Sequence, residues 1–438
     1  MQLKGPGEKP SRAIVAAVQR PGVSDLEFEA SLTELRQLAK TLGFEVVGRF
    51  TQKRAGFDAA AYFGKGKREE LRLLREQDAV DVVLVDHEIS PSQAHTLEME
   101  VGCDVMDRSM VILEIFHRHA SSRYARAQVE IARLGYMAPR MREAAKEAGP
   151  KDRGRSGTGG RSGGESQGEL DRRKIRDRIA ELQEELDGMA LEQKTQRARR
   201  QEREGLARVA LVGYTNAGKS TLMRALTQSE ALVADKLFAT LDTTVRALHP
   251  ETVPRVLVSD TVGFIKNLPH GLVASFKSTL DEALEASLLL HVIDASDAGF
   301  GRQIAVTEKV LAEIGAHEVP RLLLFNKIDR AGDATVQAER EAALRARYPG
   351  CIVMSAKREG DVARLHEAIV AFFQRHLVEA ELYLPWSAQK LRGQIFATCT
   401  VLEERADAEG AFLRVRGEPE AIARLREQLG EAVVRPRG

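Results

Sequence analysis

The chain has 438 residues, of which 43% are hydrophobic and 29% are charged, a composition typical of a globular protein with several domains. No apolar run approaches the ~18 residues of a membrane span, and three scattered cysteines argue against a disulfide framework or a cysteine metal site. We therefore expect a cytoplasmic protein, with peripheral association with a membrane as the alternative. The net charge is +1, yet residues 118–178 hold 16 Lys/Arg against 8 Asp/Glu, a net charge of +8 that favours a polyanionic partner.

Residues 13–120 alternate between strand-like and helix-like segments. The predicted strands are 13–18, 44–50, 80–85 and 103–106, and helices are expected after Ser24, after Ser90 and over 109–119. This alternation predicts a small parallel sheet with helices on both faces. The loop Gly64-Lys65-Gly66-Lys67 is a candidate phosphate site, but a helix start or an RNA contact explains it as well.

Residues 121–205 predict an antiparallel helical hairpin. Apolar residues recur at spacings of three and four in two runs, one from Tyr124 to Ala145 and the other from Ile175 to Met189. Pro139 predicts a kink or a break in the first helix. Between the runs lies a Gly/Arg-rich tip, about residues 150–168. We expect it either to contact RNA phosphates or to be a solvated loop, and the candidate RNA contacts are Arg153, Arg155 and Arg161.

Residues 206–376 carry the pattern G-x-x-x-x-G-K-S between a predicted strand and a predicted helix. The pattern is made by Gly213, Tyr214, Thr215, Asn216, Ala217, Gly218, Lys219 and Ser220. In this context it predicts a phosphate-binding P-loop, in which backbone N–H groups and a helix N-terminus face an anion. Lys219 would reach the β- and γ-phosphates, and Ser220 would be a ligand of Mg²⁺.

Three further motifs follow strands in the same region. They are Asp260-Thr261-Val262-Gly263, Asn326-Lys327-Ile328-Asp329 and Ser355-Ala356-Lys357. Asp260 can hold the metal through water, and Asp329 can accept hydrogen bonds from N1–H and the 2-amino group of guanine, which adenine lacks. The four motifs in this order predict a GTPase domain that binds GTP with Mg²⁺.

Two features bear on the hydrolysis step. A first switch loop is expected within Leu237–Thr244, where Thr240, Thr243 and Thr244 are candidate Mg²⁺ ligands. Phe264 occupies the position where many GTPases place a glutamine that orients water. Slow intrinsic hydrolysis is therefore expected, unless Phe264 is only a packing residue and another polar group orients the water.

Residues 377–438 predict a small α+β domain, with strands at 394–403 and 411–416 and a helix at 418–429. The fold class of the chain is therefore α/β. We expect a P-loop GTPase domain, preceded by a small parallel α/β domain and an antiparallel helical hairpin and followed by this α+β domain.

The assembled pattern resembles the HflX family of ribosome-associated GTPases, within the Obg–HflX group. The resemblance covers nearly the whole chain and rests on residues 64–71, 86–94, 107–116, 128–132, 164–167 with 171–173, and 238–242. Two departures are Gly168, where the family has Leu, and Thr243, where it usually has Pro.

The resemblance places the switch threonine on Thr240, making it the Mg²⁺ ligand beside Ser220. It adds Phe238, Ala239, Leu241 and Asp242 to the GTP-binding residues and implies that Lys219, Thr240 and Gly263 serve catalysis.

The resemblance also implies a protein that binds the large (50S) ribosomal subunit and its rRNA and dissociates ribosomes, with GTP hydrolysis stimulated by the ribosome. The alternatives are a GTPase that assembles the large subunit, or a signalling switch that acts on a protein effector. We expect the protein to be a monomer.

Overall fold

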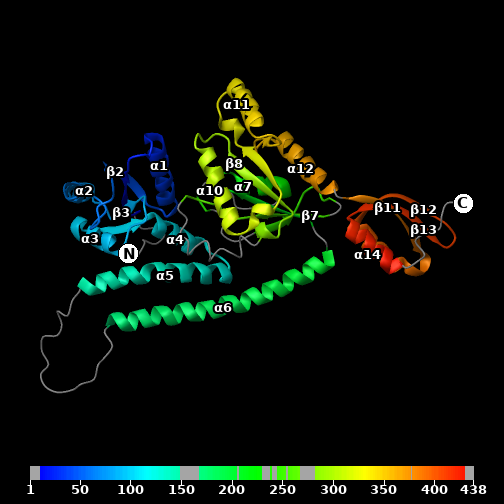
Figure 1. Cartoon of the computed structure of the whole chain (residues 1–438), viewed down its shortest axis with the longest axis horizontal. Coiled ribbons are helices and arrows are strands. Elements are labelled where there is room, and N and C mark those ends of the chain that lie inside the picture. Colours follow the sequence, from blue (N-terminus) through cyan, green and yellow to red (C-terminus); the bar gives the residue numbers. More distant parts are fainter. Residues whose placement is uncertain are drawn as a thin grey trace, which may run out of the picture. The chain divides into compact units, whose positions relative to one another are not determined.

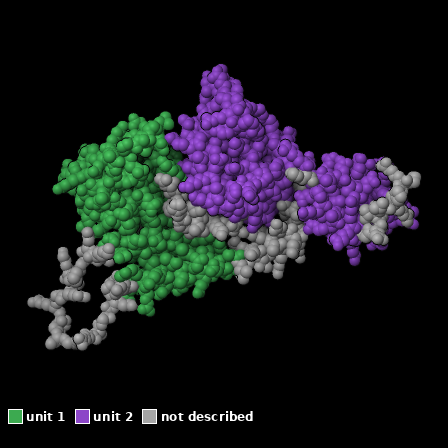
Figure 2. Space-filling view, viewed as in Figure 1, with its two compact units in different colours: residues 1–190, 234–242, 263–279 green, residues 191–233, 243–262, 280–438 purple. Residues whose placement is uncertain are grey.

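The chain divides into two compact units (Figure 2). The first contains residues 1–190, 234–242 and 263–279, and the second contains 191–233, 243–262 and 280–438. Two short segments of the predicted GTPase domain therefore belong to the first unit. The computed structural model describes residues 10–147, 167–204, 207–228, 237–238, 244–252, 255–266, 282–375 and 377–429.

A four-stranded parallel sheet in the order β2-β1-β3-β4 forms the core of the first unit (Figure 1). Its strands are β1 (Arg12–Gln19), β2 (Glu45–Lys53), β3 (Val82–Val85) and β4 (Asp104–Asp107). The central strand β1 is buried on both faces from Ala13 to Gln19, because helices cover both sides. The predicted parallel sheet is thus confirmed.

The helices of the first unit begin where the sequence places capping residues. They are α1 (Asp25–Thr41), α2 (Lys65–Gln77), α3 (Pro91–Val101) and α4 (Arg108–His119). The Ser24 side chain accepts a hydrogen bond from the N–H of Glu27, and Ser90 forms a capping box with Gln93. Gly64 is the N-cap of α2, so the Gly-Lys repeat starts a helix, as one of its alternatives predicts.

Two long helices form the predicted hairpin (Figure 1). They are α5 (Arg123–Glu147) and α6 (Gln167–Glu204). Their seam consists of Ala127, Leu182 and Leu186, with Tyr124, Ile131, Leu134 and Met189 packed around them. The end of α5 and the start of α6 lie at the same end of the pair, so the two helices run antiparallel (Figure 1). Arg153, Arg155 and Arg161 lie outside the described residues.

Helix α5 continues through Pro139, so of the two predicted alternatives, a kink or a break, the break is wrong. Tyr136 and Arg140, on either side of the proline, both donate hydrogen bonds to Oδ2 of Asp107. Arg140 Nη2 lies 2.8 Å from this oxygen. The turn that lacks a backbone donor is therefore held against the end of β4 by two side-chain contacts.

Asp107 joins three elements of the first unit. It is fully buried, and its carboxylate also accepts hydrogen bonds from the N–H groups of Ile89 (3.2 Å) and Met110 (2.9 Å). The carboxylate thus caps α4, holds the loop after β3 and anchors α5. A buried charge with four donors stabilises the fold only while these donors stay in place.

Replacing Asp107 with Asn should lower the free energy of unfolding of the first unit by about 3 kcal/mol, because the partly buried Arg140 guanidinium loses the charge of its fully buried partner. Urea unfolding followed by circular dichroism measures this change. The control is Asp171→Asn, which removes an exposed carboxylate 3.6 Å from Lys174 in α6 and should cost less than about 1 kcal/mol. Equal effects of the two substitutions would contradict the anchoring role of Asp107.

A six-stranded sheet in the order β10-β9-β8-β5-β7-β6 forms the core of the second unit. Its strands are β5 (Ala207–Gly213), β6 (Thr244–Ala247), β7 (Val256–Asp260), β8 (Leu288–Asp294), β9 (Arg321–Asn326) and β10 (Ile352–Val353). All are parallel except β6, which pairs antiparallel with β7. The strand before the P-loop and the three strands before the other motifs were predicted, and β6 was not.

Helices of the second unit complete an α/β arrangement. They are α7 (Lys219–Thr227), α10 (Phe300–Glu313), α11 (Ala334–Arg347) and α12 (Glu359–Gln374). The helix after the P-loop, α7, was predicted, but α10 and α11 were not. Within the described ranges, no helix is both long and apolar enough to cross a membrane.

The C-terminal part of the second unit is a three-stranded antiparallel sheet in the order β11-β13-β12. Its elements are β11 (Val378–Pro385), α13 (Arg392–Thr398), β12 (Cys399–Ala406), β13 (Gly410–Gly417) and α14 (Pro419–Leu429). The strand predicted to start at Gln394 is wrong over 394–398, which are helical. Because β11 and β12 flank β13 and are parallel to each other, the chain needs a crossover between them, and α13 belongs to this crossover.

Candidate functional site

Two positions of the P-loop require glycine, because any side chain there would displace a neighbouring atom. Gly213 has a φ of +145°, and a Cβ atom there would lie 2.2 Å from the carbonyl oxygen of Val292. Gly218 has a φ of +100°, and its Cβ would lie 2.3 Å from Nδ2 of Asn326. The close approach of backbone to backbone at β8, and of backbone to side chain at β9, therefore fixes the curl of the loop.

Lys219 lies inside this loop and is almost fully buried. Its ammonium group donates hydrogen bonds to the carbonyl oxygens of Gly213 (3.1 Å) and Tyr214 (2.9 Å). Burial lowers the pKa of Lys219 to about 8, although the nearby Asp260 opposes the shift. The loop thus holds a single cation at the start of α7, where the helix N-terminus also favours an anion.

Two side chains with oxygen atoms that could bind a metal meet beside the loop. The Ser220 hydroxyl donates a hydrogen bond of 2.8 Å to Oδ2 of Asp260. The next residue, Thr261, donates to the carbonyl oxygen of Leu211 at 2.6 Å and ties the end of β7 to β5. A hydroxyl and a carboxylate are the oxygen ligands that Mg²⁺ prefers, so these residues fit the metal that a GTPase uses.

The carboxamide of Asn326 connects three loops. Its Nδ2 donates to the carbonyl oxygen of Ala217 at 3.0 Å, and its Oδ1 accepts from the N–H of Ala356 at 2.9 Å. The adjacent Lys327 forms an ion pair of 2.8 Å with Asp294 and donates to the carbonyl oxygen of Asn216. The P-loop and the two loops that were predicted to recognise guanine are therefore held together by residues 326 and 327.

Two buried oxygen atoms in these loops have no hydrogen-bond partner among the described residues. They are Oδ1 of Asp329 and Oγ1 of Thr215. A buried polar atom without a partner costs free energy, and such atoms are rare in folded proteins. Asp329 follows the Asn326 bridge, and its free carboxylate oxygen fits the N–H donors of a guanine base. Ser355 precedes Ala356 in the chain. The backbone N–H of Ser355 donates a hydrogen bond of 2.8 Å to Asp361.

The remaining predicted site residues lie elsewhere in the chain. Phe238 and Gly263 belong to the first unit, whereas Asp260, Thr261 and Val262 belong to the second. The neighbouring Phe264 is fully buried. Ala239, Thr240, Leu241 and Asp242 lie outside the described residues.

A buried histidine beneath the P-loop was missed by the sequence analysis. His291 lies on β8 opposite Val212 of β5 and is 1% exposed. Burial, with smaller contributions from Arg321 and Lys219, lowers the pKa of His291 to about 3. The only signal in the sequence was a histidine within the apolar run Leu288–Ile293. This run predicts a buried strand whether or not the histidine has a function.

Acid should therefore destabilise the fold through His291. Between pH 6.5 and about 3 the unfolded chain binds a proton at this residue that the folded chain does not bind, so stability is lost as the pH falls. His291→Leu should reduce the slope of unfolding free energy against pH in this window by up to about 1.4 kcal/mol per pH unit. Urea titrations at several pH values measure the slope, and parallel curves for parent and variant would contradict the assignment.

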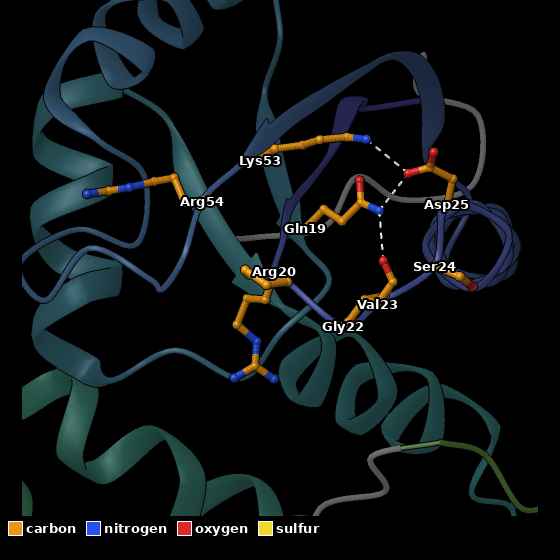
Figure 3. Close-up of a pocket in the computed structure, with 9 residues that line it drawn as sticks. Gln19, Arg20, Gly22, Val23, Ser24, Asp25, Lys53 and Arg54 are labelled. Carbon is orange, nitrogen blue, oxygen red and sulfur yellow. Dashed lines mark hydrogen bonds and ion pairs between the residues drawn. The ribbon is translucent and has the colours of Figure 1, made fainter.

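The first unit contains a hollow of about 590 Å³ at the carboxyl ends of β1 and β2 (Figure 3). It is lined by Gln19, Arg20, Pro21, Gly22, Val23, Ser24, Asp25, Lys53 and Arg54. Several of its polar groups pair with one another: the Gln19 amide donates to the carbonyl oxygen of Val23 and to Asp25, which also binds Lys53. The loop Gly64–Lys67 does not line the hollow, so the two features do not combine into a second nucleotide site.

Known proteins are similar to this chain over most of its length. Residues 29–117 match a family described as GTP-binding GTPase N-terminal, 119–200 match GTP-binding GTPase Middle Region, and 208–327 match 50S ribosome-binding GTPase. GTPase HflX of Gluconacetobacter diazotrophicus is 50% identical, and the match covers 95% of this chain and 97% of that protein. The chain belongs to the HflX family. It is accordingly a ribosome-associated GTPase that hydrolyses GTP.

More distant members agree in extent. GTPase HflX of Escherichia coli is 36% identical, covering 88% of this chain and 89% of that protein. Among solved structures, a GTP-binding protein of Sulfolobus solfataricus in complex with GDP is 22% identical with a TM-score of 0.44, covering 82% of this chain and 99% of that one.

Proposed function

We propose that this HflX GTPase binds the large (50S) ribosomal subunit and its rRNA, dissociates ribosomes, and hydrolyses GTP faster when the ribosome is bound. The observation that carries the proposal is the match of residues 208–327, which contain the P-loop, to the family described as 50S ribosome-binding GTPase. The loops that Asn326 holds together support it, because they contain the residues proposed to bind a guanine nucleotide.

The proposed roles at the phosphates follow from the geometry of the P-loop. The N–H groups of residues 213–220 face the phosphates, and Lys219 neutralises the β- and γ-phosphates. Ser220 and Thr240 are the proposed Mg²⁺ ligands, with Asp260 acting through water. Mg²⁺, when bound, neutralises charge on the phosphate oxygens. Gly263 is proposed to reach the γ-phosphate through its N–H group.

The proposed base site uses the loops that the Asn326 carboxamide joins. Asp329 pairs with the N1–H and 2-amino groups of guanine, and Lys327 packs along the base beside the P-loop. The other members of this site are Asn326, Ile328, Ser355, Ala356 and Lys357. Phe238, Ala239, Leu241 and Asp242 are proposed to contribute from the switch region.

Asp329→Asn should weaken GTP binding by at least tenfold and favour xanthosine nucleotides, whose 2-oxo group accepts a hydrogen bond from an amide. Competition binding with both nucleotides measures the change. The control is Asp333→Asn, four residues further on, where Asn remains a good N-cap for α11 and GTP affinity should stay within twofold. An unchanged preference for GTP in the Asp329 variant would remove it from the base site.

Slow intrinsic hydrolysis is the proposed consequence of Phe264. Its apolar ring is fully buried and cannot orient water, so the group that does so must come from elsewhere in the chain or from the ribosome. The burial also agrees with the alternative that Phe264 is a packing residue. Slow intrinsic hydrolysis follows only if no other polar group of the chain orients the water.

The proposed RNA-binding surface is the basic middle of the chain, with a net charge of +8 over residues 118–178. Arg153, Arg155 and Arg161 are its proposed phosphate contacts. The proposed domains are residues 13–120, 121–205, 206–376 and 377–438. We further propose a cytoplasmic monomer, with peripheral membrane association as the alternative.

Replacing Arg153, Arg155 and Arg161 together with Ala should weaken binding to 50S subunits and flatten its salt dependence by roughly one unit of log–log slope per lost phosphate contact. Co-sedimentation with 50S and 30S subunits across a salt series measures this. GTP hydrolysis without ribosomes should not change, which is the control on the same protein.

Three results would redirect the proposal. An unchanged salt slope would assign the 150–168 region to solvent. Binding to 50S subunits without dissociation of 70S ribosomes would favour subunit assembly, and no binding to either subunit would favour a protein effector.

A further inference from the structure

Arg108, the first residue of α4, is the largest side chain that is fully buried in the first unit. Its Nη1 donates to Asp86 at 2.9 Å, and its Nη2 donates to Glu34. Asp86 is itself buried and accepts a hydrogen bond from Ser31 at 2.5 Å. The guanidinium is therefore fixed in position by a carboxylate that follows β3 and another from α1.

A third nitrogen of this guanidinium, Nε, donates a hydrogen bond to the backbone. Nε of Arg108 donates to the carbonyl oxygen of Lys266 at 3.3 Å. Lys266 lies six residues after Asp260 and three after Gly263, in a segment that belongs to the first unit. The ammonium group of Lys266 also lies 3.5 Å from the carboxylate of Glu27 in α1. The segment after Gly263 is thus held at its backbone and at a side chain.

The other end of α4 contacts the second GTPase-domain segment that belongs to the first unit, residues 234–242. Phe116 packs against Phe238, with ring centroids 4.6 Å apart and both rings buried. Phe238 precedes the switch threonine Thr240 by two residues. One helix of the N-terminal sheet domain therefore contacts the chain just before Thr240 and just after Gly263.

We infer that Arg108 is a positioning residue for GTP hydrolysis, acting through the backbone of residues 263–266. The inference rests on the role proposed above for Gly263 at the γ-phosphate. Ordering the loop at Gly263 costs conformational entropy. Because Arg108 already fixes the backbone at Lys266, three residues away, less of this entropy must be lost during the reaction. Arginine suits this task because its planar group presents donors in fixed directions, and lysine cannot hold three acceptors in the same geometry. The buried charge thereby connects the N-terminal sheet domain to the hydrolysis step.

The first test compares two arginines that both bind buried carboxylates. Arg108→Lys should lower kcat for GTP hydrolysis without ribosomes about tenfold, with KM and GDP affinity within twofold of the parent. Arg140→Lys, which loses the pairing with buried Asp107 but does not act on residues 263–266, should leave kcat unchanged. Thermal melts compare the stability of the two variants. Since ribosomes are absent, failure of the ribosome proposal does not affect the result.

A second pair of variants avoids the buried core, in case Arg108→Lys fails to fold. Glu27→Gln removes the partner of Lys266, and Glu29→Gln removes an exposed carboxylate two residues further along α1, 2.7 Å from Arg49. Glu27→Gln should lower kcat two- to threefold and speed hydrogen exchange at residues 264–266, whereas Glu29→Gln should do neither. Equal kcat values within each pair, or a rise in kcat on loss of either contact, would overturn the positioning role.

Discussion

The nucleotide site depends on one neutral side chain, the carboxamide of Asn326. It donates to the P-loop at Ala217 and accepts from the loop at Ala356, so these two loops cannot separate without breaking a hydrogen bond to Asn326. The same amide nitrogen stands where a Cβ of Gly218 would be, which is why that position requires glycine. A hydrogen-bonded side chain suits this position because it holds the loops together whether or not a ligand is bound. Among the described residues, the buried Oδ1 of Asp329 has no hydrogen-bond partner, which agrees with its proposed role in binding the guanine base.

The parts of the site that could be predicted are those where local backbone geometry dictates the residue. Gly213 and Gly218 need positive φ and close approach, and a serine or proline at a helix start identifies the caps of α1 and α3. These requirements are written in consecutive residues, so the P-loop and most strands followed from the sequence. Contacts such as Asp107 with Tyr136 and Arg140 join residues about thirty positions apart. Only the folded chain shows that they hold α5 together across Pro139.

The assignment of two segments to the first unit also lay beyond the sequence. Residues 263–266 follow a strand of the GTPase sheet directly, so the sequence predicted only that they belong to the GTPase domain. Arg108 looked like an ordinary residue at a helix start, because nothing local indicates that its guanidinium is fully buried between Asp86 and Glu34. The error at residues 394–398 has a related cause. β-Branched and aromatic residues favour a strand, but the crossover between two parallel strands imposes a helix.

The central claim is that the GTP-bound protein acts on assembled ribosomes, and light scattering of 70S particles tests it most directly. Mixing 70S ribosomes with the protein and either GTP or a non-hydrolysable GTP analogue should lower the scattering as subunits separate. With GDP the scattering should stay constant, because the switch segments lack the γ-phosphate that orders them. An equal fall with GDP, or no fall with any nucleotide, would contradict the account.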